Sequence, residues 1–244
     1  MTVTEATRLA VLIDSDNATA SVTTELLEEI AKYGTPTVKR AYGDWTTQNL
    51  VGWKEELARH AIQPVQQFAY TRGKNSTDSA LIIDAMDLLY AGNVEGFVIV
   101  SSDSDFTRLA TRLRESGLTV YGLGRRSTPE AFVAACDRFI WLDLLSRERQ
   151  EPQAPASPDG EPTSPLPDLK RLLVTAISGT SKEDGWSHLG AVGSYLSKSH
   201  AAFDPRDYGH TKLGELVRGE SYIEVKDVQD QTGLSQPWVR LRPT

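Results

Sequence analysis

Three aspartates lie next to predicted strands or a predicted helix, where their carboxylates could bind a metal ion. Asp14 ends an apolar run in LIDSDN, Asp103 follows another in VSSDSDF, and Asp78 comes just before a long amphipathic stretch. Carboxylates that converge without a cation repel one another, which raises their pKa values. Carboxylate oxygens favour hard ions, so these acids predict a site for Mg²⁺ or Mn²⁺.

The reaction expected of such an ion is phosphodiester hydrolysis, because it lowers the pKa of a bound water and stabilises charge on a phosphate. Asn17, three residues after Asp14, can hydrogen-bond a carboxylate or a phosphate without adding negative charge. Lys74 follows a glycine near Asp78 and can reach a substrate phosphate.

Helix capping is the alternative explanation for these residues. Asp16, Asn17 and Asp105 are all good N-caps, and carboxylates are favoured near helix N-termini. Capping needs one such residue per helix, and the sequence has more than that, which favours a site. Asp84 and Asp87 lie further along the same amphipathic stretch, and we expect them on a solvated face.

The elements that position these acids follow from the alternation of short apolar runs with helical patterns. Continuously apolar strands are typical of a parallel sheet covered on both faces. Ligands bind beyond the carboxyl ends of such strands, so the acids should share one rim. The expected strands are Leu9–Ile13, Val38–Tyr42, Val65–Ala69, Phe97–Val100, Leu118–Leu123 and Phe139–Leu145, and the expected helices are Val22–Ala31, Leu50–His60, Ala80–Tyr90, Phe106–Leu113 and Ala131–Ala135.

A second domain is predicted after a break in composition. The run Gln150–Asp168 has six prolines and no periodicity, which is typical of a linker. We assign residues 1–149 to the first domain, 150–165 to the linker and 166–244 to the second domain. Three short helical patterns, Leu169–Ile177, Trp186–Ser197 and Lys212–Val217, precede the strand-like segments YIEVKDV and PWVRLRP, and together they predict a winged helix.

Composition narrows the class of protein. Cys136 is the single cysteine of the 244 residues, so an internal disulfide is excluded and we expect a small buried hydrophobe. The net charge is −7, which gives no support for nucleic-acid binding, although residues 166–244 carry ten basic and ten acidic side chains. The sequence has no membrane span and no signal peptide, so we expect a cytoplasmic protein.

At this point the motifs resemble those of a known family. LIDSDN, KNSTD and VSSDSDF, in this order, are similar to the motifs of the NYN domain, also called the LabA-like family, a branch of the PIN-like nucleases. The resemblance covers about residues 7–146. It implies a metal-dependent endoribonuclease in which Asp14, Asp78 and Asp103 hold the ion, while Asn17 and Asp105 match accompanying motif positions.

The C-terminal segment resembles the LOTUS or OST-HTH domain through DGWSHLGAVGSYL and FDPRDYGHTKLGELV. That family consists of winged helices associated with RNA binding. The chain Gly122–Arg126 follows a strand, but it lacks the spacing of a known phosphate loop. The basic residues expected to contact RNA are Arg125 and Arg126 in the first domain and Lys182, Lys198, Arg206, His210 and Lys212 in the second.

Two other functions stay open from the sequence. The same fold could bind RNA as a non-catalytic adaptor, and a phosphatase or nucleotide-binding protein would also explain the carboxylates but not the second domain. The sequence also leaves open a homodimer, the choice of RNA and the number of ions.

Overall fold

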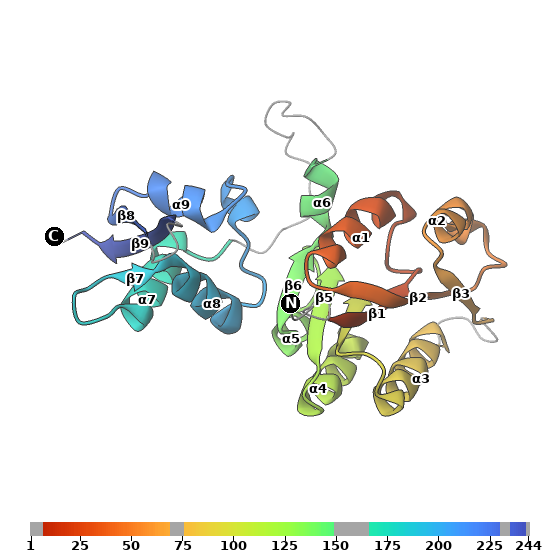
Figure 1. Cartoon of the computed structure of the whole chain (residues 1–244). Helices are drawn as coiled ribbons and strands as arrows, with labels where there is room; N and C mark the ends of the chain where they lie inside the picture. Colours follow the sequence, from red (N-terminus) through yellow and green to blue (C-terminus); the bar gives the residue numbers. More distant parts are fainter. Residues whose placement is uncertain (1–6, 69–75, 149–165, 230–234, 243–244) are drawn as a thin grey trace. The chain divides into compact units, whose positions relative to one another are not determined.

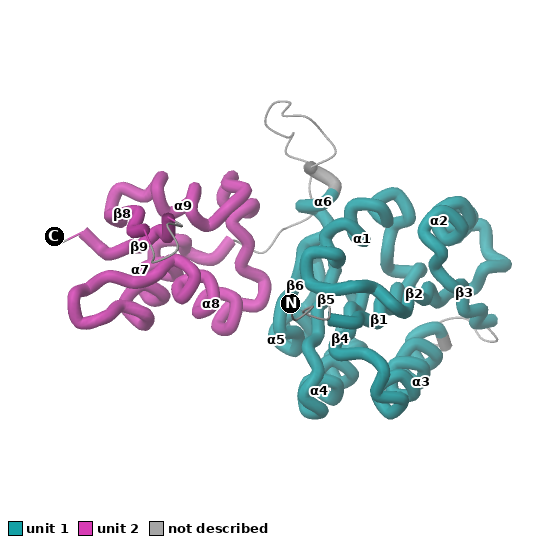
Figure 2. The backbone as a smooth tube through the Cα atoms, viewed as in Figure 1, with its two compact units in different colours: residues 1–163 teal, residues 164–244 magenta. Residues whose placement is uncertain are grey.

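The computed structural model describes residues 7–68, 76–148, 166–229 and 235–242. The chain divides into two compact units, Met1–Thr163 and Ser164–Thr244 (Figures 1 and 2). The predicted linker and Lys74 lie outside the described residues.

A six-stranded parallel sheet forms the centre of the first unit. Its order is β3-β2-β1-β4-β5-β6, so the chain winds in one direction from β1 to β3 and in the other from β4 to β6. The crevice between β1 and β4 is therefore the switch point at which such sheets bind ligands. The strands are β1 (Arg8–Asp14), β2 (Thr35–Gly43), β3 (Gln63–Gln66), β4 (Gly96–Val100), β5 (Thr119–Gly124) and β6 (Arg138–Trp141).

Helices cover both faces of this sheet, as the apolar strands predict (Figure 1). Alternate residues of β1, among them Val11 and Ile13, pack under α1 (Thr23–Ala31), α2 (Trp53–Arg59) and α6 (Leu142–Glu148). The opposite face is covered by α3 (Ser76–Ala91) and α4 (Thr107–Glu115), with α5 (Glu130–Ala135) beside α4. The structure thus confirms the predicted doubly wound α/β class.

The second unit is a small helical domain with an antiparallel sheet of its own. Its helices are α7 (Leu169–Thr180), α8 (Leu189–Ser199) and α9 (Leu213–Gly219). Its sheet has the order β7-β9-β8, with β7 (Ser187–His188), β8 (Ile223–Gln229) and β9 (Ser235–Leu241). Leu173, Val192, Leu196, Val217 and Val239 form a separate core, which completes the predicted winged helix.

Three predicted elements differ from the structure. The run Phe139–Leu145 divides between β6 and α6, because a continuous apolar run does not show where a strand gives way to a helix. The third strand, Gln63–Gln66, begins two residues before the predicted Val65–Ala69, and Ala69 lies outside the described residues. Trp186 does not begin a helix, since β7 follows it and α8 begins at Leu189.

Among the described residues, no helix combines the length and the apolar character that crossing a bilayer requires.

Candidate active site

Asp14 is the last residue of β1 and reaches the rim of the sheet at the switch point. It points to the same side as Ala10 and Leu12, which is the side covered by α3 and α4. Its side chain is only 1% exposed. A carboxylate buried to this degree needs partners, because burial penalises its charged form.

Two hydrogen bonds hold one oxygen of Asp14. Its Oδ2 accepts from Asn17 Nδ2 and from Ser101 Oγ, both at 2.7 Å. Its Oδ1 is buried and has no hydrogen-bond partner among the described residues. Burial raises the pKa of Asp14, while the bonds from Asn17 and Ser101 oppose this change only in part. The carboxylate therefore has one oxygen that is fixed and one that still lacks a positive partner.

Ser101 links Asp14 to the loop after β4. Its hydroxyl donates to Asp14 and accepts from the backbone N–H of Asp103 at 3.1 Å. Asp103 in turn caps the short 3-10 helix η3 (Ser104–Phe106) by accepting from the N–H of Asp105 at 2.9 Å. The ends of β1 and β4 are thus joined by side chains as well as by the sheet.

Three further carboxylates gather at this rim. Asp78, Asp103 and Asp105 each offer one oxygen, and these oxygens all lie within 4.8 Å of one another. Burial raises the pKa of Asp78 to about 6, and the negative charges of Asp14, Asp103 and Asp105 add to the increase. The sequence placed Asp14 in the central trio, whereas the structure groups Asp105 with Asp78 and Asp103 and sets Asp14 beside them.

Contacts with the sheet and the β1 loop hold α3, which carries Asp78. Thr77 Oγ1 donates to Asp16 Oδ2 at 3.3 Å beyond the end of β1. Two turns further along, Asp84 accepts from the guanidinium of Arg40 and from the hydroxyl of Tyr42, both on β2. The prediction of a solvated Asp84 was wrong, because the sequence does not show which helical acid faces a cation on the sheet.

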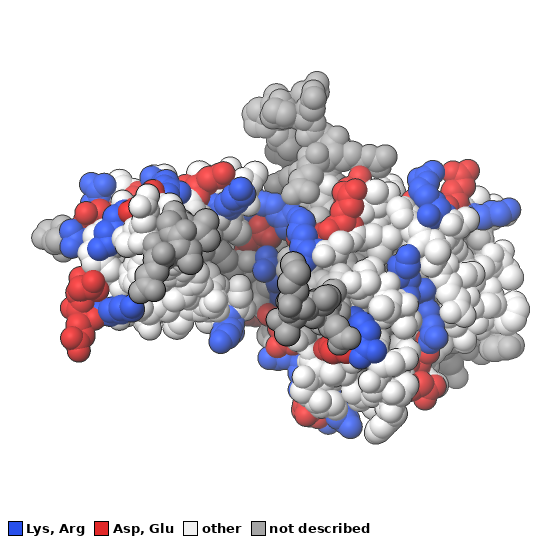
Figure 3. All heavy atoms as spheres, in the orientation of Figure 1, with Lys and Arg blue, Asp and Glu red and all other residues white. Residues whose placement is uncertain are grey.

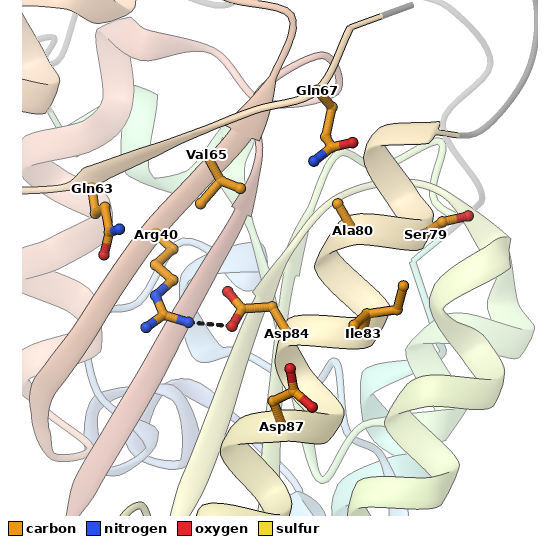
Figure 4. A pocket seen from close by; sticks show the side chains of 9 residues that line it. All are labelled: Arg40, Gln63, Val65, Gln67, Ser79, Ala80, Ile83, Asp84 and Asp87. Atoms are coloured by element: carbon orange, nitrogen blue, oxygen red, sulfur yellow. Dashed lines mark hydrogen bonds and ion pairs between the residues drawn. The ribbon is translucent and has the colours of Figure 1, made fainter.

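A pocket of about 540 Å³ lies between α3 and the strands β2 and β3 (Figure 4). Ser79 and Ala80, the two residues that follow Asp78 in α3, line this pocket. The Arg40–Asp84 pair crosses it (Figure 4). None of the clustered carboxylates lines this pocket, which is bounded instead by Asp84 and Asp87 further along α3.

Capping explains only part of the acidic cluster. Asp103 does cap a helix, as the alternative explanation expects. Neither Asp14 nor Asn17 caps one, because the side chain of Asn17 donates to Asp14. Helix capping therefore does not account for Asp14, Asn17 and Ser101.

The two arginines after β5 have different surroundings. The backbone of Arg125 donates to Ser102 Oγ at 2.9 Å, and its guanidinium reaches Thr19 Oγ1 at 3.4 Å, so it lies by the rim. The guanidinium of Arg126 lies 4.8 Å from the centre of the Trp141 ring, and its backbone N–H donates to Asp143 Oδ2 at 3.2 Å. Gly124 is explained by packing, since a Cβ there would lie 2.7 Å from the carbonyl oxygen of Ser101.

The basic residues predicted in the second unit also differ in their surroundings. Lys182, Lys198 and Lys212 are exposed, and His210 is partly exposed. Arg206 is paired with Asp204 at 2.8 Å in a nearly buried ion pair, so its charge is already neutralised. Cys136 is buried as predicted, and burial raises the pKa of its thiol to about 12.

The donor set fits a hard divalent cation. All the clustered side chains offer oxygen, the buried Oδ1 of Asp14 lacks a partner, and burial together with mutual repulsion raises the pKa of Asp78. A cation between these groups would remove each of these costs. Ser101 was missed as a member of this site, although its place within the VSSDSDF motif, directly after β4, was a usable signal.

The doubly wound sheet, with acids at its switch point, defines an α/β domain of the PIN-like type. The NYN domain model matches residues 8–143, more than half of the chain, and the chain belongs to the NYN domain family. The OST-HTH/LOTUS domain model matches residues 161–234. Both resemblances found in the motifs are thus confirmed.

Three solved structures are similar to parts of this chain, and the first shows similarity of fold. A protein of unknown function from Vibrio parahaemolyticus is 16% identical over 58% of this chain and 96% of its own, with a TM-score of 0.50. A solution structure of residues 175–257 of a Chromobacterium violaceum protein is 33% identical over 31% of this chain and 80% of its own, with a TM-score of 0.27. An uncharacterized protein from Nitrosomonas europaea is 25% identical over 39% and 92%, with a TM-score of 0.30. Comparison with curated proteins gives no significant match.

Proposed function

We propose that this protein is an endoribonuclease that depends on Mg²⁺ or Mn²⁺ and that its second unit supplies affinity for RNA. The observation that carries the proposal is the group of carboxylates at the switch point, in which Asp78, Asp103 and Asp105 converge beside the buried Asp14. Membership of the NYN family and the attached OST-HTH/LOTUS domain support the same conclusion.

The roles of the side chains follow from their contacts. Asp78, Asp103 and Asp105 would hold the ion, and Asp14 would contribute through its unpartnered Oδ1. When bound, the ion supplies a polarised water for attack and stabilises charge on the scissile phosphate. Asn17 and Ser101 keep Asp14 in place, and Arg125 at the rim can bind a neighbouring phosphate of the RNA backbone.

The experiment that tests this function is RNA cleavage by the purified protein. End-labelled structured and unstructured RNAs are incubated with Mn²⁺, with Mg²⁺ or with a chelator, alongside the Asp103→Asn variant. We expect metal-dependent internal cuts by the wild type, and loss of cutting with an intact fold in the variant, since Asn keeps the volume but removes the charge. RNA binding without cleavage under any of these conditions would instead support a non-catalytic adaptor.

A further inference from the structure

The outward face of the small antiparallel sheet carries aromatic and basic side chains in rows. His188 of β7 pairs with Trp238 of β9, which pairs with Lys226 of β8, so these three lie side by side across the sheet. Arg240, two residues after Trp238, shares their side. The neighbouring residues Ser187 and Val239 point the other way and are fully buried. We call His188, Trp238, Lys226, Arg240 and the flanking Trp186 and Lys182 the wing face.

Tryptophan rings hold the cations of the wing face. Lys226 Nζ lies 3.8 Å from the centre of a Trp186 ring, and the Arg240 guanidinium lies 4.7 Å from it. Lys182 Nζ lies 4.8 Å from the centre of a Trp238 ring. An indole face attracts a cation without neutralising its charge. These contacts therefore fix the lysines on the surface while leaving their charge available.

The other cations of this unit provide a contrast. Arg206 is paired with Asp204 and Arg218 with Asp227, so their charges are balanced. Arg240 also contacts Glu224 at 2.7 Å. Lys182 and Lys226 form no ion pair with any carboxylate in the described part of the chain. On the side visible in Figure 3, basic and acidic side chains are interspersed. Lys182 and Lys226 are therefore distinguished by charges that no carboxylate of the described residues balances, and not by a high local number of basic side chains.

His188 packs beside Trp238 and has one ring nitrogen without a hydrogen-bond partner among the described residues. Its Nδ1 accepts from the N–H of Gly190 at 3.1 Å, so in the neutral ring the proton is on Nε2. That Nε2 is buried and has no hydrogen-bond partner among the described residues. The ring stands edge-on to Trp238, with centroids 5.6 Å apart.

We propose that the wing face binds single-stranded RNA, with a base stacked on Trp238 and phosphates held by Lys182 and Lys226. Stacking of a base on an aromatic ring is stronger than an exposed cation–π contact, so a base can displace Lys182 from the ring. The displaced ammonium is then free to contact the adjacent phosphate. Duplex RNA keeps its bases stacked internally and cannot make this exchange. This inference rests on the proposed RNA-binding role of the second unit and assigns it a surface and a strand preference.

The test measures RNA binding by the full chain in the Asp103→Asn background, so that no substrate is cut. Fluorescence anisotropy compares a short oligouridine with a hairpin duplex at two salt concentrations. Trp238→Leu should weaken oligouridine binding by about tenfold with little change in the salt dependence, because it removes a stack. The double variant Lys182→Gln, Lys226→Gln should weaken it and also reduce the salt dependence, because it removes two phosphate contacts. The matched control is Lys170→Gln, Arg171→Gln, which removes two exposed cations elsewhere on the same unit that are not among the residues expected to contact RNA.

Binding unchanged by both wing-face variants would overturn the inference, as would losses confined to the Lys170, Arg171 control or a preference for the duplex. Absence of RNA binding by the parent protein would also overturn it. Thermal melting identifies any loss of RNA binding that is due to misfolding of Trp238→Leu. If that variant misfolds, the double variant Lys182→Gln, Lys226→Gln decides. Cleavage is read separately with the protein that retains Asp103. A chain that cuts RNA but binds it independently of the wing face refutes only this inference, and one that binds through the wing face without cutting refutes only the nuclease.

Discussion

Ser101 Oγ donates to Asp14 Oδ2 at 2.7 Å, and this bond joins the ends of β4 and β1 inside the protein. The same hydroxyl accepts from the backbone of Asp103, so one side chain orients two of the acids in the proposed site. We expect Ser101→Ala to reduce cleavage by about tenfold or more, as losses of groups that orient metal ligands usually do. Single-turnover cleavage at saturating Mn²⁺ measures the effect.

The matched control for this prediction is Ser104→Ala, which changes an exposed serine in the same loop. Its rate should stay near that of the wild type. Equal losses in both variants would indicate a general disturbance of the loop and would remove Ser101 from the site.

A pH-dependent stability follows from Asp78 in the metal-free protein. Its pKa is raised to about 6 from 3.8, so the folded state binds this proton more tightly than the unfolded chain does. The ionised form is therefore disfavoured by folding, and stability falls as pH rises from about 4 to about 6. Asp78→Asn lacks this loss. The variant should melt above the wild type at neutral pH, and the difference should shrink toward pH 4.

The measurement is thermal melting in chelator across this range of pH. Asp87→Asn is a suitable control, because Asp87 is an exposed acid on the same helix and is not one of the clustered carboxylates. A constant difference between Asp78→Asn and the wild type at every pH would show that the raised pKa of Asp78 is not the source of the difference.

Metal binding should stabilise the fold through the same acids. An ion that binds only the native state stabilises it by about 2.7 kcal/mol at a concentration one hundred times its Kd. We expect Mn²⁺ to raise the Tm of the wild type and to leave unchanged a variant in which Asp78 and Asp103 are both Asn. Differential scanning fluorimetry with Mn²⁺ and with Ca²⁺ provides the comparison. Equal shifts in the two proteins would place the ion elsewhere.

Most of the fold was predictable because buried parallel strands leave a continuous apolar signal, as Leu9–Ile13 of β1 does. The rim was predictable for a related reason, since residues that directly follow such strands must meet at one edge of the sheet. Asp14 and Asp103 are residues of this kind. Hydrophobic periodicity did not predict the elements whose bounds depend on tertiary contacts. Examples are the junction of β6 and α6 and the short strand β7.

Side-chain partners were the part of the site that sequence could not supply. The pairing of Asp84 with Arg40 and Tyr42 joins a helix to a strand across 44 residues, and nothing in either segment specifies the other. The grouping of Asp105 with Asp78 and Asp103 depends on the turn that η3 makes after β4. Both are consequences of tertiary packing.

The Asp84 pair gives a prediction for the position of α3. Asp84→Ala leaves the half-buried Arg40 and the buried hydroxyl of Tyr42 without their shared acceptor, which should cost about 2 kcal/mol of stability. Asp84→Asn keeps an acceptor and should cost less. Because α3 carries Asp78, we also expect Asp84→Ala to weaken the Mn²⁺-dependent rise in Tm.

Urea unfolding at fixed pH gives the difference in unfolding free energy between the wild type and each Asp84 variant. The Mn²⁺ titration is repeated on Asp84→Ala and Asp84→Asn under conditions in which both variants are folded. Asp87→Ala serves as the control on the exposed side of the helix. If Asp84→Ala shows the predicted loss of stability but an unchanged Mn²⁺ response, Asp84 anchors the helix without positioning the site.

The two units should also separate the chemistry from the RNA affinity. Each has its own apolar core, one around Val11 and Ile13 of β1 and the other around Leu173 and Val239. Cutting the chain at Pro155 should therefore leave two halves that each unfold cooperatively.

The N-terminal half keeps Asp14, Asp78, Asp103 and Asp105, so its kcat at saturating RNA should stay within about twofold of the full chain. Its KM should rise by about tenfold or more, because a tethered second site raises the local concentration of bound RNA. Adding the C-terminal half in trans should not restore the KM, since the benefit depends on the covalent link. An unchanged KM for the isolated N-terminal half would assign RNA affinity to the nuclease unit itself and leave the winged helix to bind another protein.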